Sequence, residues 1–153
     1  MNWEFHATLI AATLPAEATM ESALKQMRMM WIFFLIAAFA YVAVAEFLPH
    51  SVPPVKPEVY TIILVVGIME LLSIVIVRKV LLTKAEEVLR TTPNDMAAIF
   101  RWRQGQLVTL ALASAVVLIG LVLRFIGAST IQAAPLYLLG IAAMLIFQPK
   151  AIQ

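Results

Sequence analysis

Cysteine is absent from the sequence, and histidine and glycine are scarce. The absence of cysteine excludes a disulfide framework, a thiolate nucleophile and a thiolate metal site. The two histidines, His6 near the N-terminus and His50 after the first apolar run, lie too far apart to share a site. No HExxH, GxSxG or glycine-rich phosphate-binding motif occurs. We therefore expect no enzyme, no cofactor and no metal site.

Charge is also scarce, at 13% of residues, whereas hydrophobic residues make up 63%. Soluble domains have roughly 25% charged and about 45–50% apolar residues. A chain of 153 residues cannot bury that apolar surplus in one core, so its second solvent must be lipid. The net charge of only +2 gives no electrostatic footprint for nucleic acid. The predicted partners are the bilayer and other membrane subunits, or further copies of the chain.

Four apolar runs approach the length of about 20 residues with which a helix crosses a membrane. They cover residues 29–48, 59–77, 107–126 and 128–147. Pro49 closes the first run, Arg78 the second and Gly127 the third, while the fourth carries polar Gln132 near its start. We predict an all-α, four-helix transmembrane bundle.

The distribution of Lys and Arg predicts the orientation. With a cytoplasmic N-terminus, two basic residues, Lys56 and Arg124, lie outside. The other nine lie inside: Lys25, Arg28, Arg78, Lys79, Lys84, Arg90, Arg101, Arg103 and Lys150. Both termini are therefore predicted to be cytoplasmic. The predicted organisation is a cytoplasmic segment (1–27) in which an interfacial helix is one option, a transmembrane domain (28–148) and a cytoplasmic tail (149–153).

The polar connection between the second and third runs predicts an extended cytoplasmic hairpin. Its first part, TKAEEVLR, consists of good helix formers and pairs Glu86 with Arg90 four residues on. Thr92 as N-cap, Pro93 at the first helical position and Asp95 at the third predict the start of the next helix. About a dozen residues at 1.5 Å rise would then protrude roughly 15–20 Å from the membrane.

Arg101 and Arg103 flank Trp102 where the third helix enters the membrane. Two roles are open for the arginines: contacts to a cytoplasmic partner, or anchors on lipid headgroups. Trp102 is expected at the membrane interface, as aromatic belts prefer.

Glu46 and Arg124 lie at the same outer level, because each follows the start of an outward-running helix by 17 residues. One interpretation is an ion pair between the first and third helices. The other is that each side chain extends separately to the outer interface, which the closeness of both residues to water favours.

Glu70 lies near the middle of the second run, where no basic residue shares its depth. Ionisable residues at this depth are costly and are functional candidates by default. Ser114 on the third run lies at a similar depth. One interpretation is a neutral carboxyl group that is hydrogen-bonded to Ser114 or to a backbone carbonyl. The alternatives are a proton or cation site, or a contact with another subunit.

The segment LALASAVVLIGLVL, residues 110–123, resembles the second helix of ATPase proteolipid (c-type) subunits. That family has a carboxylate six residues before the glycine, where this chain has Ser114 before Gly120. The resemblance implies a proton or cation carrier only if Glu70, on the neighbouring helix, supplies the acid.

The whole chain resembles a family of small uncharacterised bacterial four-span membrane proteins. The resemblance rests on Tyr41-x-x-x-Ala45-Glu46, on the RWR element at Arg101–Arg103 and on GLVLRFIG at 120–127. It implies a fold and a location in the bacterial inner membrane, but no activity. The favoured function is a non-enzymatic accessory or scaffold subunit of a membrane complex, and the alternative is the proteolipid-like carrier that uses Glu70.

Overall fold

The computed structural model describes residues 19–47 and 53–151, all of whose regular structure is helical. The helices are α2 (Met20–Phe47), α3 (Pro57–Val77), the π-helical turn η1 (Arg78–Leu82), α4 (Thr83–Thr91), α5 (Met96–Phe125) and α6 (Thr130–Ile146). α3, η1 and α4 continue into one another as a single helical segment of 35 residues. α2, this segment and α5 are each long and apolar enough to cross a membrane, whereas α6 is a shorter apolar helix. The chain is therefore compatible with a multi-pass membrane protein.

The helix starts are set by local capping chemistry. The hydroxyl of Thr19 accepts a hydrogen bond from the backbone N–H of Ser22 and so caps α2. α3 starts with Pro57, whose missing N–H costs nothing at a first helical position. Ser129 and Gln132 form a reciprocal capping box at the start of α6.

The predicted N-cap of α5 was wrong by three residues. Thr92 ends α4, and α5 starts after Asp95, whose carboxylate accepts a 2.7 Å hydrogen bond from Ala98 N. Both residues are good cap formers. Asp95 becomes the cap because Thr92 is still held by the preceding helix through its N–H bond to Val88 O.

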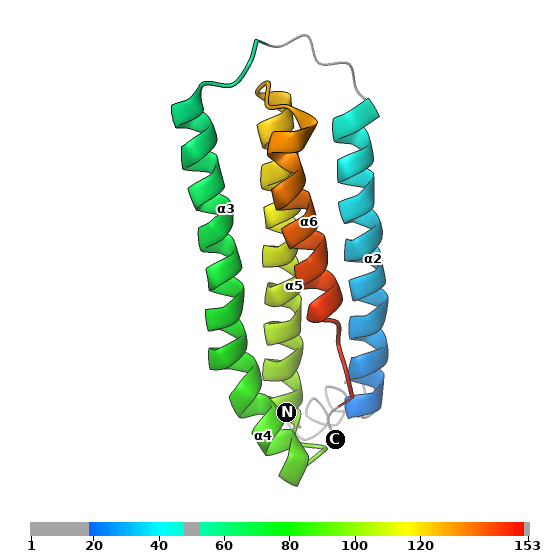
Figure 1. The fold of residues 1–153 in the computed structure, drawn as a ribbon. Helices are drawn as coiled ribbons and strands as arrows, with labels where there is room; N and C mark the ends of the chain where they lie inside the picture. Colours follow the sequence, from blue (N-terminus) through cyan, green and yellow to red (C-terminus); the bar gives the residue numbers. More distant parts are fainter. Residues whose placement is uncertain (1–18, 48–52, 152–153) are drawn as a thin grey trace, which may run out of the picture.

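α5 is the central helix and contacts α2, α3 and α6, whereas α2 and α3 do not contact each other. Figure 1 shows α3 and α2 on either side of α5, with α6 lying against it. The molecule is thus a layer of three helices, α3–α5–α2, with α6 on one face. The bundle has two ends. At the hairpin end α4 turns into α5, and at the connector end residues 126–129 join α5 to α6.

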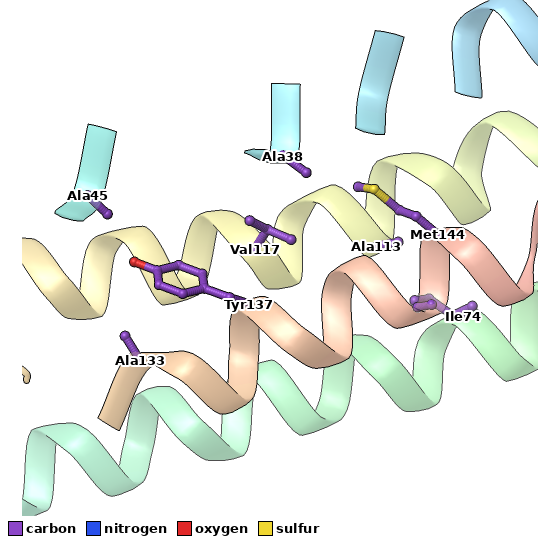
Figure 2. Packing of buried hydrophobic residues seen from close by; sticks show 9 residues of the cluster. Ala38, Ala45, Ile74, Ala113, Val117, Ala133, Tyr137 and Met144 are labelled. Atoms are coloured by element: carbon purple, nitrogen blue, oxygen red, sulfur yellow. The ribbon is translucent and has the colours of Figure 1, made fainter. Parts of the chain in front are cut away.

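The tightest packing joins α5 to α6. A Cβ at Gly140 would lie 2.5 Å from a methyl group of Val117 and 2.9 Å from the carbonyl oxygen of Ala113, so glycine permits the close approach of the two backbones. Figure 2 shows Val117, Tyr137 and Met144 filling the space between these helices and the alanines of α2.

A second buried cluster lies at the hairpin end. It consists of Ala23, Met27, Leu82, Ala85, Leu89, Ala98, Ile99 and Trp102. Trp102 is fully buried there, so its ring packs inside the protein and does not face lipid headgroups. The reason is that α2 starts at Met20, nine residues before the predicted apolar run, and its first turns cover the base of the hairpin. The predicted interfacial helix in residues 1–27 lies mostly outside the described residues.

Candidate functional site

Polar side chains from three helices meet at the connector end. Arg124 Nε of α5 lies 3.1 Å from Glu46 Oε1 of α2 and forms a salt bridge with it. Thr130 Oγ1, in the first turn of α6, donates a 2.7 Å hydrogen bond to the other carboxylate oxygen of Glu46. Arg124 Nη1 donates a 2.9 Å hydrogen bond to the carbonyl of Ala128. The group therefore ties α2, α5 and α6 together.

The structure thus brings Glu46 and Arg124 together, and the two side chains do not extend separately to the interface. The ion pair was one of the two interpretations of the sequence, but its additional partners, Ala128 and Thr130, were not predicted, because they lie in the connector and in the start of α6. Hydrogen bonds to charged groups are about twice as strong as neutral ones. Both side chains are less than one-third exposed, which protects the pair from solvent screening.

Glu70 does not form the hydrogen bond predicted for it. Within the part of the chain that the structure describes, its carboxyl group has no hydrogen-bond or salt-bridge partner. Its side chain is half-buried at the edge of the inward face of α3, whose buried members are Gly67 and Ile74. Glu70 is therefore a carboxyl group in the middle of an apolar helix, and no residue of 19–47 or 53–151 satisfies it by a hydrogen bond or salt bridge.

The missing bond to Ser114 has a geometric cause. Gly105 packs against Leu82 of η1, the turn that continues α3. Nine residues, or two and a half helical turns, separate Ser114 from Gly105. Ser114 therefore lies on the side of α5 away from α3. Three turns separate it from Arg103, which bonds to Gln26, so Ser114 faces α2 and is 6% exposed. Similar depth along two helices is therefore not sufficient for contact, because the rotation of α5 turns Ser114 away from α3.

The two arginines of the RWR element have different environments. Arg103 is half-buried and donates a hydrogen bond to the side-chain oxygen of Gln26 on α2. Arg101 is exposed and bonds to no other described residue. Of the two, Arg101 is the one free to meet a headgroup or a partner, whereas Arg103 links two helices of the same chain.

Sequence reasoning missed a cavity of about 510 Å³ at the hairpin end. It is lined by Arg78, Glu86, Arg90, Gln106, Ile146, Gln148, Lys150 and Ala151. In the sequence its three basic residues served to predict orientation and, for Arg90, a pair with Glu86 within one helix. They are up to 72 positions apart, from Arg78 to Lys150. The signal that could have found the cavity is Gln106, an amide one residue before the predicted third span, which starts at residue 107.

Across residues 19–47 and 53–151, no group of three or more His, Asp or Glu side chains is arranged to hold a metal ion. The chain matches no protein-family model, no curated protein and no solved structure. The two family resemblances drawn from the sequence therefore stay predictions, and function has to be argued from the geometry.

Proposed function

We propose that the protein is a non-enzymatic accessory or scaffold subunit of a membrane complex, which receives a helix of another membrane protein against α5. The observation that supports this proposal is the incomplete covering of α5. α6 covers one side of the three-helix layer, and α2 and α3 are not in contact across the other side. A partner helix at that position would complete the ring around α5.

The uncovered side of α5 is apolar and contains small residues at its centre. Exposed side chains follow one another at helical spacing along it, at Val108, Ala111, Leu118 and Val122, with half-buried Ala115 between them. Membrane helices associate by close packing at small residues, because lipid tails give them no hydrophobic driving force. The two alanines, flanked by α2 and α3, supply such a place.

Site-specific crosslinking in the native membrane tests this proposal, and the absence of cysteine leaves no background. Leu118→Cys places a crosslinker on the uncovered side of α5. Leu139→Cys is the matched control, on an exposed position of α6. We expect a discrete adduct with another membrane protein from position 118 and none from position 139. Native mass spectrometry of the gently extracted protein should then show the same partner in a stoichiometric complex.

A monomer in native mass spectrometry, with no protein adduct from either position, would contradict the accessory role. An adduct of the chain with itself, together with a homo-oligomeric ring, would instead favour the second candidate function. That candidate is a proteolipid-like proton or cation carrier, and it is supported by the unsatisfied carboxyl group of Glu70.

The Glu70→Gln variant separates the two functions. Gln keeps a donor and an acceptor but cannot exchange a proton. A carrier reconstituted in liposomes should lose proton or cation flux in this variant and retain it in Glu70→Asp. A scaffold subunit should keep its partner in both variants. Partner binding retained without any flux in the wild-type protein eliminates the carrier.

The proposed location is the inner membrane of a bacterium, with both termini in the cytoplasm, and it is supported by the excess of Lys and Arg at the hairpin end. Lys84→Cys in α4 and Lys56→Cys before α3 test it, since both positions are exposed. A membrane-impermeant thiol reagent applied to intact cells should label position 56 and leave position 84 unlabelled. The reverse result would invert the topology.

A further inference from the structure

The cavity at the hairpin end exists because α6 is shorter than the helices around it. α6 has 17 residues, whereas α2 and α5 have 28 and 30. In Figure 1, α6 stops well before the hairpin end, and the chain continues as an extended segment toward the C-terminus. The space left below Ile146 is lined by η1 and α4 on one side, by Gln106 of α5 and by the C-terminal segment with Lys150. A volume of about 510 Å³ is within the range of roughly 300–1,000 Å³ for small-molecule sites.

The residues that line the cavity carry an excess of positive charge. Arg78, Arg90 and Lys150 line it, and Glu86 is its one acidic residue. None of the three cations forms a salt bridge or a hydrogen bond with any described residue. This differs from the connector end, where Arg124 has two acceptors.

Two of the lining residues each have a buried polar atom without a hydrogen-bond partner among the described residues. Gln106 is 3% exposed, and its side-chain oxygen has no hydrogen-bond partner among the described residues. Arg78 also has a buried nitrogen, Nη1, with no partner there, and its guanidinium lies 4.5 Å from the ring centroid of Phe147. A buried polar group without a partner costs about 1–3 kcal/mol. A polar ligand in the cavity would satisfy groups of this kind.

We propose that this cavity binds a phosphate group, supplied by the headgroup of an anionic phospholipid. Guanidinium and ammonium groups are the side chains that bind phosphate, and the three that line the cavity outnumber its one carboxylate. Ile146, the last residue of an apolar helix, is part of the same wall, so the site lies where acyl chains give way to headgroups. A π-helical turn begins at Arg78, and such turns are frequent at functional sites. The proposal does not depend on either candidate function above.

Native mass spectrometry of the delipidated full-length protein tests the site, with phosphatidylglycerol added and phosphatidylcholine as the neutral lipid. The test variants are Arg90→Gln and Lys150→Gln, both at exposed positions that leave the fold intact. The matched control is Lys79→Gln, an exposed basic residue next to Arg78 that does not line the cavity. We expect a defined stoichiometry of phosphatidylglycerol, weakened about fivefold by each test variant, and unchanged binding in the control.

Gln106→Leu gives a second readout, because it removes the buried amide without changing charge. We expect it to weaken phosphatidylglycerol binding while leaving the far-ultraviolet circular dichroism spectrum unchanged. Equal weakening by Lys79→Gln and the two test variants would mean diffuse surface attraction and would overturn the site. Equal binding of phosphatidylcholine, or no discrete lipid adduct, would overturn it as well.

A titration with inorganic phosphate distinguishes a lipid headgroup from free phosphate as the ligand of the cavity. If millimolar phosphate raises the thermal stability of the protein in detergent, and both test variants abolish this effect, the phosphate site stands but its ligand is the free anion. If phosphate has no effect while phosphatidylglycerol stabilises the protein, the lipid headgroup is the ligand.

Discussion

The two ends of the molecule differ in how far their polar side chains bond to one another. At the connector end, Glu46, Arg124 and Thr130 satisfy one another and join three helices. At the hairpin end, the cations around the cavity and the buried amide of Gln106 have no hydrogen-bond or salt-bridge partner among the described residues. Because unsatisfied buried polar groups are costly, the comparison assigns a structural role to the first set and a ligand to the second.

The largest expected effect is at the connector end. Arg124→Gln removes the salt bridge to Glu46 and the bond to Ala128. We expect the free energy of unfolding to fall by about 3 kcal/mol, since each hydrogen bond to a charged group contributes roughly 1.5–3 kcal/mol. The measurement is reversible unfolding in mixed micelles with increasing SDS, with exposed Arg101→Gln as the control.

A double-mutant cycle shows whether this loss belongs to the pair. Glu46→Gln combined with Arg124→Gln should cost clearly less than the sum of the single losses. Simple additivity would mean that the two side chains do not stabilise each other. The exchange variant, Glu46→Arg with Arg124→Glu, should restore stability only in part. The carbonyl of Ala128 accepts a hydrogen bond from Arg124 in the wild-type protein, and a carboxylate at position 124 could not donate one.

The next largest effect is expected at Gly127 in the connector. Its φ of 99° is one that side chains rarely allow, and an added Cβ would lie 2.1 Å from the carbonyl oxygen of Pro53. Gly127→Ala should cost about 2 kcal/mol. Gly67→Ala is the control, because the Cβ there meets only the movable end of Leu136. Similar losses in the same SDS titration at both glycines would contradict the account.

A smaller effect is expected from Thr130→Val, which removes the hydrogen bond to Glu46 but leaves the salt bridge. We expect a loss of about 1 kcal/mol. Thr61→Val is the matched control, since its hydroxyl group only donates to Pro57 O one turn earlier in the same helix. An equal change in the SDS midpoint for both variants would mean that the hydroxyl group of Thr130 does not contribute to the connector end.

The smallest effect should come from the buried amide at the hairpin end. In lipid-free detergent, Gln106→Leu should leave the free energy of unfolding unchanged or raise it by about 1 kcal/mol, because no partner is left unsatisfied. A loss as large as that of Arg124→Gln would show that Gln106 is satisfied within the chain, and would remove the contrast between the two ends.

The two pairs of polar residues that the sequence placed at equal depth show how far it could predict the site. Glu46 and Arg124 were matched in depth, and so were Glu70 and Ser114, yet only the first pair meets. Depth follows from residue counts along a helix of known rise. Rotation about the helix axis does not, because it depends on which neighbours a helix packs against, and Ser114 faces α2 instead of α3.

The sequence by itself determined that the chain is helical and apolar and where its apolar helices lie, because lipid requires every backbone polar group to be bonded within its own helix. Only the tertiary structure decided that α5 is central, that Thr130 completes the Glu46–Arg124 pair and that Lys150 reaches the same cavity as Arg78. These contacts join residues far apart in the chain. They depend on side-chain packing such as the close approach at Gly140, which no local pattern encodes.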